Sequence, residues 1–151
     1  MKKIIIIGAG AMGSAFAVPC LENKNKVTLV GTHLEDELIN NIQLNNNFHP
    51  ALNIELPSKL KVEKFEKLQS ILEEGVDIIV AGVSSVGIEW FVKQITKSYK
   101  KNLPIILLTK GLAIEGNELI TLSDKIKKLL KDQGHTDVNI SAIKGPCLAA
   151  G

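Results

Sequence analysis

Apolar runs with few polar interruptions alternate along this chain with stretches in which apolar residues recur at helical spacing. The first run is four consecutive isoleucines at residues 4–7. Such a run is typical of a strand covered on both faces, as in a parallel sheet. Further strands are predicted at residues 26–30, 60–62, 77–83, 104–108 and 138–143.

The segments between these strands carry the spacing of amphipathic helices. Helices are predicted at residues 11–22, 66–74 and 86–99, around Leu34, Leu38, Ile39 and Ile42, and from about residue 121 through Ile126, Leu129 and Leu130. A polar, turn-rich loop is expected from residue 45 to about 58. This alternation predicts one α/β domain over residues 1–151, a doubly wound (Rossmann-type) parallel sheet with right-handed crossovers.

A glycine motif joins the first predicted strand to the first helix. Gly8, Gly10 and Gly13 fit the spacing G-x-G-x-x-G. In this setting the first glycine permits a tight turn, the second lets the backbone approach a pyrophosphate, and the third lets the helix pack closely on the strand. The helix that begins near Ala11 and Met12 directs free N–H groups and the positive end of its dipole at the phosphates. The motif therefore predicts dinucleotide binding.

The charged residues and cysteines narrow the choice of partners and compartment. A net charge of +2 is too small to indicate a nucleic-acid-binding protein. All 18 basic residues are lysines, so any bound anion is held by lysine, backbone or hydroxyl groups rather than by an arginine fork. Cys20 and Cys147 are far apart and in no metal-ligand spacing, which indicates a reducing compartment and predicts a cytoplasmic protein without a metal site.

One stretch permits a different interpretation. Residues 4–21 carry no charge and follow two lysines, a pattern that also occurs in signal peptides and membrane spans. Glycines at fingerprint spacing, Pro19 and the strand-like residues that follow favour a folded domain without a membrane span.

Candidate chemistry gathers at the residues that directly follow the predicted strands. In a doubly wound sheet, ligands bind outside the carboxyl ends of the strands. The residues in these places are Gly8 to Met12, Thr32 and His33, Ser84 and Ser85, Thr109 and Lys110, and Gly145, Pro146 and Cys147. Lys110 is the strongest candidate for catalysis. An ammonium group directly after a buried strand can be presented to the negative charge of a phosphate or to a carbonyl oxygen.

The end of the second strand bears on the choice between NAD and NADP. An acid there binds the ribose 2′-hydroxyl of NAD, whereas a cation favours the 2′-phosphate of NADP. The slot holds Gly31, Thr32 and His33, which permits NADP, but the lack of arginine gives no strong preference for it. The acids at residues 35–37 are expected to complement a helix dipole instead. His49, before a proline in the polar loop, is expected to face solvent.

Several of these short segments together resemble the amino-terminal domain of NAD(P)-dependent glycerol-3-phosphate dehydrogenases. The segments are Gly8-Ala-Gly-Ala-Met-Gly13, Val30-Gly31-Thr32-His33, Val83-Ser84-Ser85, Thr109-Lys110-Gly111-Leu112 and Gly145-Pro146-Cys147-Leu148-Ala149. The sequence departs from that family at Ala11 and Met12, where a serine and an aromatic residue are usual. It also departs at Cys147, where serine, threonine or asparagine is usual and a thiol is a poorer hydrogen-bond donor to phosphate.

The resemblance implies roles for individual residues. It implies that Lys110, Gly145 and Cys147 contact glycerol 3-phosphate or dihydroxyacetone phosphate, and that the coenzyme lies against Ala11, Met12, Thr32, Lys110 and Ala149. It also implies a carboxyl-terminal helical substrate domain outside residues 1–151, with a second lysine that relays the proton. By that reading the chain alone binds coenzyme with little or no turnover, and the whole enzyme is a homo-oligomer.

Two other functions stay open from the residues. One is an NAD(P)-dependent reductase of 2-keto or 3-hydroxy acids with the same architecture, although the pairing of Thr109-Lys110 with Gly145-Pro146 argues against it. The other is a non-catalytic module that senses nucleotides.

Overall fold

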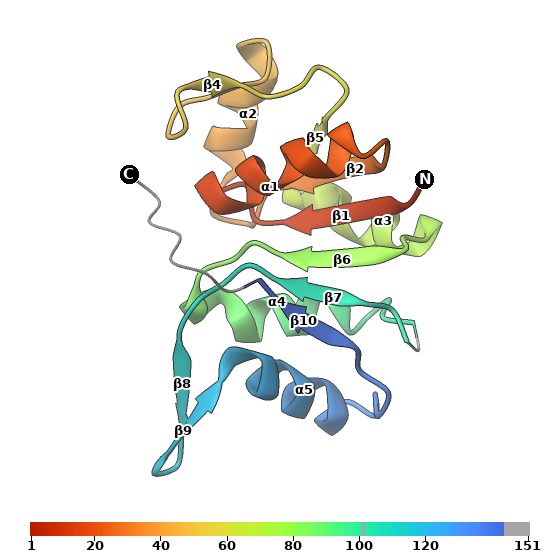
Figure 1. Cartoon of the computed structure of the whole chain (residues 1–151), viewed down its shortest axis with the longest axis vertical. Helices are drawn as coiled ribbons and strands as arrows, with labels where there is room; N and C mark the ends of the chain where they lie inside the picture. The colour runs from red at the N-terminus through yellow and green to blue at the C-terminus, as the bar shows by residue number, and fades with distance from the viewer. Residues whose placement is uncertain (101, 144–151) are drawn as a thin grey trace.

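The computed structural model describes residues 1–100 and 102–143, and a six-stranded parallel sheet forms its centre (Figure 1). The strands lie in the order β10-β7-β6-β1-β2-β5. Their bounds are β1 Lys3–Ile7, β2 Lys26–Val30, β5 Lys61–Glu63, β6 Ile78–Ala81, β7 Ile105–Leu107 and β10 Ile140–Ala142. The chain moves outward from β1 to β5 and then returns to β6 on the other side of β1, which confirms the predicted doubly wound sheet.

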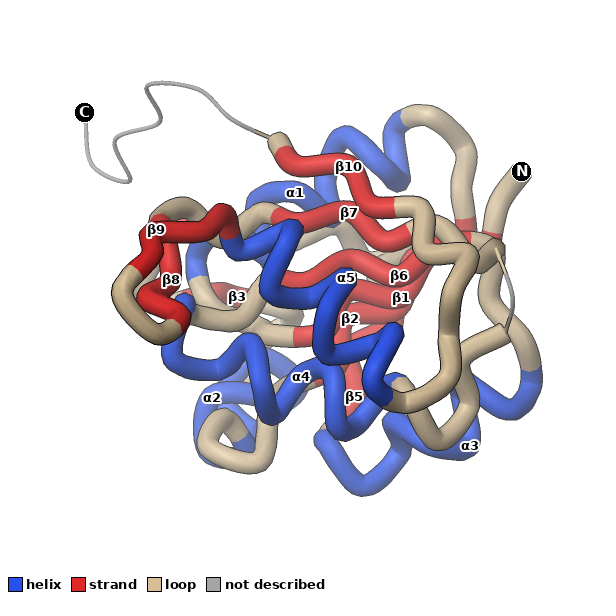
Figure 2. The backbone as a smooth tube through the Cα atoms, turned by 90° about the horizontal axis from the view of Figure 1, so that it is seen from below, coloured by secondary structure: helices blue, strands red, loops and turns tan. Residues whose placement is uncertain are grey.

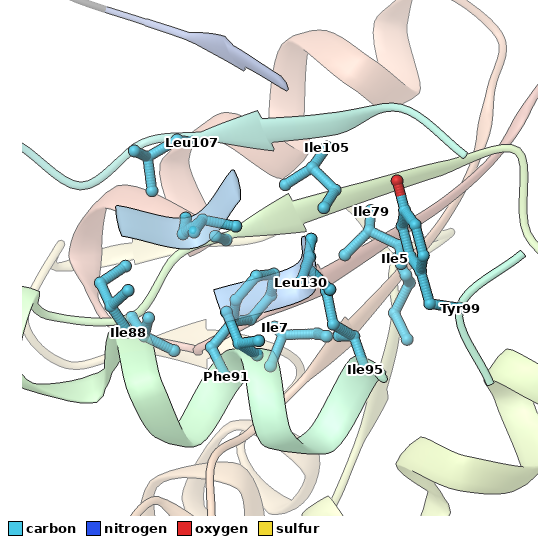
Figure 3. Packing of buried hydrophobic residues seen from close by; sticks show 14 of the residues in the cluster. Ile5, Ile7, Ile79, Ile88, Phe91, Ile95, Tyr99, Ile105, Leu107 and Leu130 are labelled. Atoms are coloured by element: carbon cyan, nitrogen blue, oxygen red, sulfur yellow. The ribbon is translucent and has the colours of Figure 1, made fainter. Parts of the chain in front are cut away.

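The isoleucines of β1 alternate between two separate hydrophobic clusters. Ile5 and Ile7 point into a cluster that α3 (Leu68–Glu74), α4 (Ile88–Ile95) and α5 (Leu122–Asp132) cover. In Figure 3, Phe91 and Ile95 of α4 pack against this face of the sheet. Ile4 and Ile6 belong to the opposite cluster, which residues of α1 (Ala11–Glu22) and α2 (Asp36–Leu44) cover. All four isoleucines are buried, as an unbroken apolar strand requires.

Two predicted helices begin differently from the sequence expectation. A short 3₁₀ turn, Phe65–Lys67, precedes α3, and another, Ser85–Gly87, precedes α4. The helix predicted at 86–99 is therefore regular only over Ile88–Ile95. The tighter turn at residues 85–87 directs Ser84 and Val86 outward at the carboxyl end of β6, and Val86 is 90% exposed.

Two small antiparallel hairpins were not expected. The strands β3 (Phe48–His49) and β4 (Ile54–Glu55) lie within the predicted loop at 45–58. The strands β8 (Leu112–Glu115) and β9 (Glu118–Thr121) follow β7 and lead into α5. Figure 2 shows the strands of the main sheet side by side and the β8–β9 hairpin at one end of it.

The amino-terminal uncharged stretch is divided between a strand and a short helix. The helix α1 has 12 residues. Within residues 1–100 and 102–143, no helix combines the length and the apolar character needed to cross a bilayer.

Candidate functional site: a dinucleotide cleft

A cleft of about 740 Å³ lies at the carboxyl ends of β1, β2, β6 and β7. The arrowheads of β1, β6 and β7 mark that edge in Figure 1. Its lining residues are Gly10, Ala11, Met12, Thr32, His33, Leu34, Glu35, Gly82, Val83, Ser84, Val86, Gly87, Trp90, Leu108, Thr109 and Lys110. A cleft of this volume at the point where the strand order reverses is the usual place for a nucleotide in such a sheet.

The glycine-rich turn forms the floor of the cleft through very close backbone packing. Gly8 has a φ of +108°, and a Cβ atom there would lie 2.6 Å from the carbonyl oxygen of Gly82. A Cβ atom on Gly13 would lie 2.1 Å from the carbonyl oxygen of Gly8. Neither position tolerates a side chain without movement of the backbone. Gly8 and Gly13 therefore shape the turn from beneath and do not line the cleft.

Gly10 stands in open space at the start of α1. It is the N-cap of the helix, and no side chain among residues 1–100 and 102–143 caps the helix there. No acidic residue occupies the first turn. Among the same described residues, the nearest atom to a Cβ on Gly10 would be Glu35 Oε1, at 3.9 Å. The first amides of a helix have no intrahelical acceptor, so those of Ala11 and Met12 are suited to a phosphate in this space.

Three side chains hold the peptide groups of Ala9. The Ser14 hydroxyl donates to the carbonyl oxygen of Ala9 at 3.0 Å, and His49 Nε2 lies 2.9 Å from the same oxygen. Leu52 donates its backbone N–H to His49 Nδ1 at 3.2 Å. Since Nδ1 accepts, Nε2 carries the proton and donates to Ala9. The N–H of Ala9 donates to Glu35 Oε2 at 3.0 Å. The glycine-rich turn is thus fixed before a ligand arrives.

The expectation that His49 faces solvent is wrong. Its side chain is fully buried, because the β3–β4 hairpin folds the loop back onto the glycine-rich turn. A buried imidazole is stable here because both ring nitrogens have a partner.

Glu35 also differs from its expected role. Its Oε2 accepts a second hydrogen bond, at 2.7 Å, from the backbone N–H of Thr32. The turn after β2 closes with a bond from the Glu35 N–H to the Thr32 carbonyl, and this turn brings the carboxylate back to the end of the strand. The end of β2, which the sequence indicated to lack an acid, therefore has the carboxylate of Glu35 beside it. The neighbouring Asp36 and Glu37 do occupy the first turn of α2, as predicted.

An aromatic group borders the cleft between β2 and α4. The ring centroids of His33 and Trp90 are 5.0 Å apart, and those of Phe65 and Trp90 are 5.3 Å apart. Trp90 is half-buried and lines the cleft, whereas its helical neighbours Phe91 and Ile95 are in the core. Flat apolar rings at this end of the site suit the stacking of a base.

The opposite end of the cleft carries Lys110. The Thr109 hydroxyl donates to the carbonyl oxygen of Val83 at 2.5 Å and so ties the end of β7 to the end of β6. Lys110 follows with an exposed side chain and lines both the main cleft and a second hollow of about 320 Å³. It is the one lysine among the described residues of the cleft wall.

The structure brings most of the sequence-predicted residues to one cleft. Those that line it are Gly10, Ala11, Met12, Thr32, His33, Ser84, Thr109 and Lys110. Gly145, Cys147 and Ala149 lie outside the described residues. Sequence reasoning missed Glu35 and Trp90. The short distance in sequence between Thr32 and Glu35 was a usable signal for the first. For the second, the signal was that Trp90 stands apart from the helical spacing of the apolar residues Ile88, Phe91, Val92 and Ile95.

The chain is similar to known proteins along nearly its whole length. Residues 3–151 match the family model described as NAD-dependent glycerol-3-phosphate dehydrogenase N-terminus. The NADP(+)-dependent glycerol-3-phosphate dehydrogenase of Archaeoglobus fulgidus is 34% identical over 148 residues, covering 97% of this chain and 42% of that enzyme. The glycerol-3-phosphate dehydrogenase [NAD(P)+] of Mesoplasma florum is 33% identical over 151 residues, again covering 42% of its length.

A solved structure agrees with these relatives. The crystal structure of glycerol-3-phosphate dehydrogenase from Coxiella burnetii has a TM-score of 0.78 and 26% identity, covering 98% of this chain and 42% of that one. The chain thus spans less than half the length of the relatives it matches. On the match over residues 3–151, the chain belongs to the NAD-dependent glycerol-3-phosphate dehydrogenase family and corresponds to its N-terminal part.

Proposed function

We propose that residues 1–151 form the coenzyme domain of an enzyme that interconverts sn-glycerol 3-phosphate and dihydroxyacetone phosphate with NAD or NADP. The observation that carries this proposal is the uncapped start of α1 beside the open space at Gly10. Together they offer amide donors and room for a diphosphate at the floor of a cleft with an aromatic wall.

The residues fit the coenzyme by position along the cleft. Ala11 and Met12 face the diphosphate from the helix start, while Thr32, His33 and Trp90 border the place for the adenosine. Lys110 and Ser84 border the other end. When bound, the dinucleotide supplies or accepts the hydride that interconverts an alcohol and a ketone.

Lys110 has the placement of a residue that serves coenzyme and substrate together. It borders the coenzyme cleft and the adjoining hollow, and its ammonium group can offset negative charge on a phosphate or a developing alkoxide. Gly145 and Cys147 belong to the proposed substrate site on the resemblance alone. The proton relay, in the same proposal, comes from a lysine of a helical domain beyond these residues, and the whole enzyme is a cytoplasmic homo-oligomer.

Calorimetric titration with NADH and with NADPH tests coenzyme binding. We expect one site per chain for at least one of the two coenzymes. The proposal would be overturned if neither NADH nor NADPH gave a heat of binding to the folded protein at up to millimolar concentration. Little or no turnover of dihydroxyacetone phosphate by residues 1–151 is expected, so binding rather than activity is the readout.

A lysine variant tests the proposed role of Lys110 in substrate binding. Lys110→Met should weaken binding of dihydroxyacetone phosphate to the coenzyme complex by about tenfold, the typical effect of removing one charge-assisted bond. Lys97→Met is the matched control, since this exposed lysine lies beyond the C-terminal end of α4, away from the cleft. Equal losses in the two variants would reject a role for Lys110.

A further inference from the structure

We infer that Glu35 makes this site selective for NAD(H) over NADP(H), which rests on the proposed function. Its carboxylate lies at the end of β2, within the cleft wall, although the residue itself is the N-cap of α2. An acid at this place accepts a hydrogen bond from the ribose 2′-hydroxyl, which NADP replaces by a phosphate.

Two backbone bonds place the carboxylate there. Oε2 accepts from Thr32 N at 2.7 Å and from Ala9 N at 3.0 Å, so one oxygen joins the end of β2 to the glycine-rich turn. In the described part of the chain, both hydrogen bonds of the Glu35 side chain are accepted by Oε2. Oε1 is directed toward the open space at Gly10, where it would be 3.9 Å from a Cβ atom. An acceptor is thus presented to the cleft beside the place of the diphosphate.

The same arrangement disfavours a 2′-phosphate. The Thr32 amide, a natural donor to such a phosphate, is already bonded to the carboxylate. A phosphate monoester carries about −1.5 to −2 charge at neutral pH, and like charges in contact are costly in a partly buried site. No arginine exists in the sequence, and the imidazole of His33, which lines the cleft, packs against Trp90 and Phe65.

This selectivity differs from that of a relative. The Archaeoglobus fulgidus enzyme, 34% identical to this chain, is named as NADP(+)-dependent. Membership of the family therefore leaves the preference of this chain open, and the position of one carboxylate decides it.

The charge can be removed with little change in shape. In Glu35→Gln the side-chain carbonyl still accepts from the amides of Thr32 and Ala9, while the negative charge is gone. Glu37→Gln is the matched control, an exposed acid in the first turn of the same helix and outside the cleft wall. NADH and NADPH are titrated calorimetrically into the unmodified chain and both variants.

We expect the unmodified chain to bind NADH about tenfold or more tightly than NADPH, the size of effect expected for one like-charge contact. Glu35→Gln should reduce that ratio at least about fivefold, mainly by tighter NADPH binding, and Glu37→Gln should leave it within about twofold. A further readout needs no variant. Raising NaCl from about 50 to about 500 mM should narrow the NADH preference of the unmodified chain, because salt screens the repulsion.

The failures are distinguishable. Equal binding of the two coenzymes by the unmodified chain, or tighter NADPH binding, would overturn the selectivity and leave the proposed function standing. An unchanged ratio in folded Glu35→Gln would show that another group selects. If Glu35→Gln does not fold, a ratio insensitive to salt would overturn the charge-based selection. Binding of neither coenzyme would overturn the proposed function and this inference with it.

Discussion

His49 Nε2 lies 2.9 Å from the carbonyl oxygen of Ala9, a residue 40 positions earlier in the chain. This bond links the β3–β4 hairpin to the glycine-rich turn and is fully buried. The Ala9 amide, in turn, donates to Glu35. A loop that carries no conspicuous pattern thus helps to hold the turn on which the coenzyme site depends.

Replacing this histidine should destabilise the protein. His49→Ala removes the bond to Ala9 and the bond from Leu52 and leaves a cavity, so we expect a loss of about 2–3 kcal/mol. For a chain of this length that corresponds to a fall in Tm of about 6–10 °C in a thermal melt. The exposed His33→Ala should lose less than about 1 kcal/mol. Similar melting temperatures for the two variants would contradict the structural role of His49.

Two glycines of the motif should respond differently to the same added methyl group. Gly10 has a φ of −63° and open space around it, so Gly10→Ala should keep the Tm within about 2 °C yet weaken coenzyme binding, because the methyl group occupies the place of the diphosphate. At Gly13 the added carbon meets the carbonyl oxygen of Gly8, so Gly13→Ala should cost about 3 kcal/mol or more.

Thermal melts and calorimetry on both variants separate the two effects. The expected order would be contradicted by a large loss of stability in Gly10→Ala, or by unaltered coenzyme binding in that variant.

The single tryptophan should report on the adenine end of the coenzyme. The ring centroids of Trp90 and His33 are 5.0 Å apart at the border of the cleft. A base stacked there should quench the fluorescence of Trp90. We expect quenching by NADH and by 5′-AMP, but not by nicotinamide mononucleotide, which lacks the adenine. Trp90→Leu should weaken NADH binding about fivefold in calorimetry, corresponding to about 1 kcal/mol of lost stacking. Quenching by the mononucleotide alone would place the coenzyme the other way round.

The thiol of Cys20 should be poorly reactive in the folded protein. It is half-buried against the hydrophobic cluster that α1 and α2 cover, and burial raises the pKa of the thiol above its ordinary value. Alkylation by iodoacetamide at pH 8, followed by mass spectrometry of the peptide that contains Cys20, should therefore be much slower in the native state than in urea.

The sign of the pH effect on stability follows from the same shift. Above about pH 9 the unfolded chain loses this proton before the folded chain does, so the contribution of Cys20 to stability falls as the pH rises. Equal rates of alkylation in the folded and unfolded states would contradict the burial.

The sequence by itself determined the doubly wound sheet, because its signals are local. Four isoleucines in a row require cover on both faces, and the order of strands and helices restricts the connections to right-handed crossovers. Strand ends then mark the ligand edge, which placed Thr32, Ser84 and Lys110 at one cleft without any knowledge of contacts. The spacing of Gly8, Gly10 and Gly13 carried the coenzyme prediction in the same way.

Only the tertiary structure decided the position of His49, the position of the Glu35 carboxylate, and the use of Trp90 as a wall of the cleft. His49 and Glu35 both bond to the Ala9 peptide groups, across 40 and 26 residues. Hydrophobic periodicity predicts which side of a helix or strand is buried, but it does not predict which loop folds back onto which turn. Those contacts depend on the path of the chain in space. The short distance in sequence between Thr32 and Glu35 only makes Glu35 a candidate, and the bond from the Ala9 amide, 26 residues away, shows where its carboxylate lies.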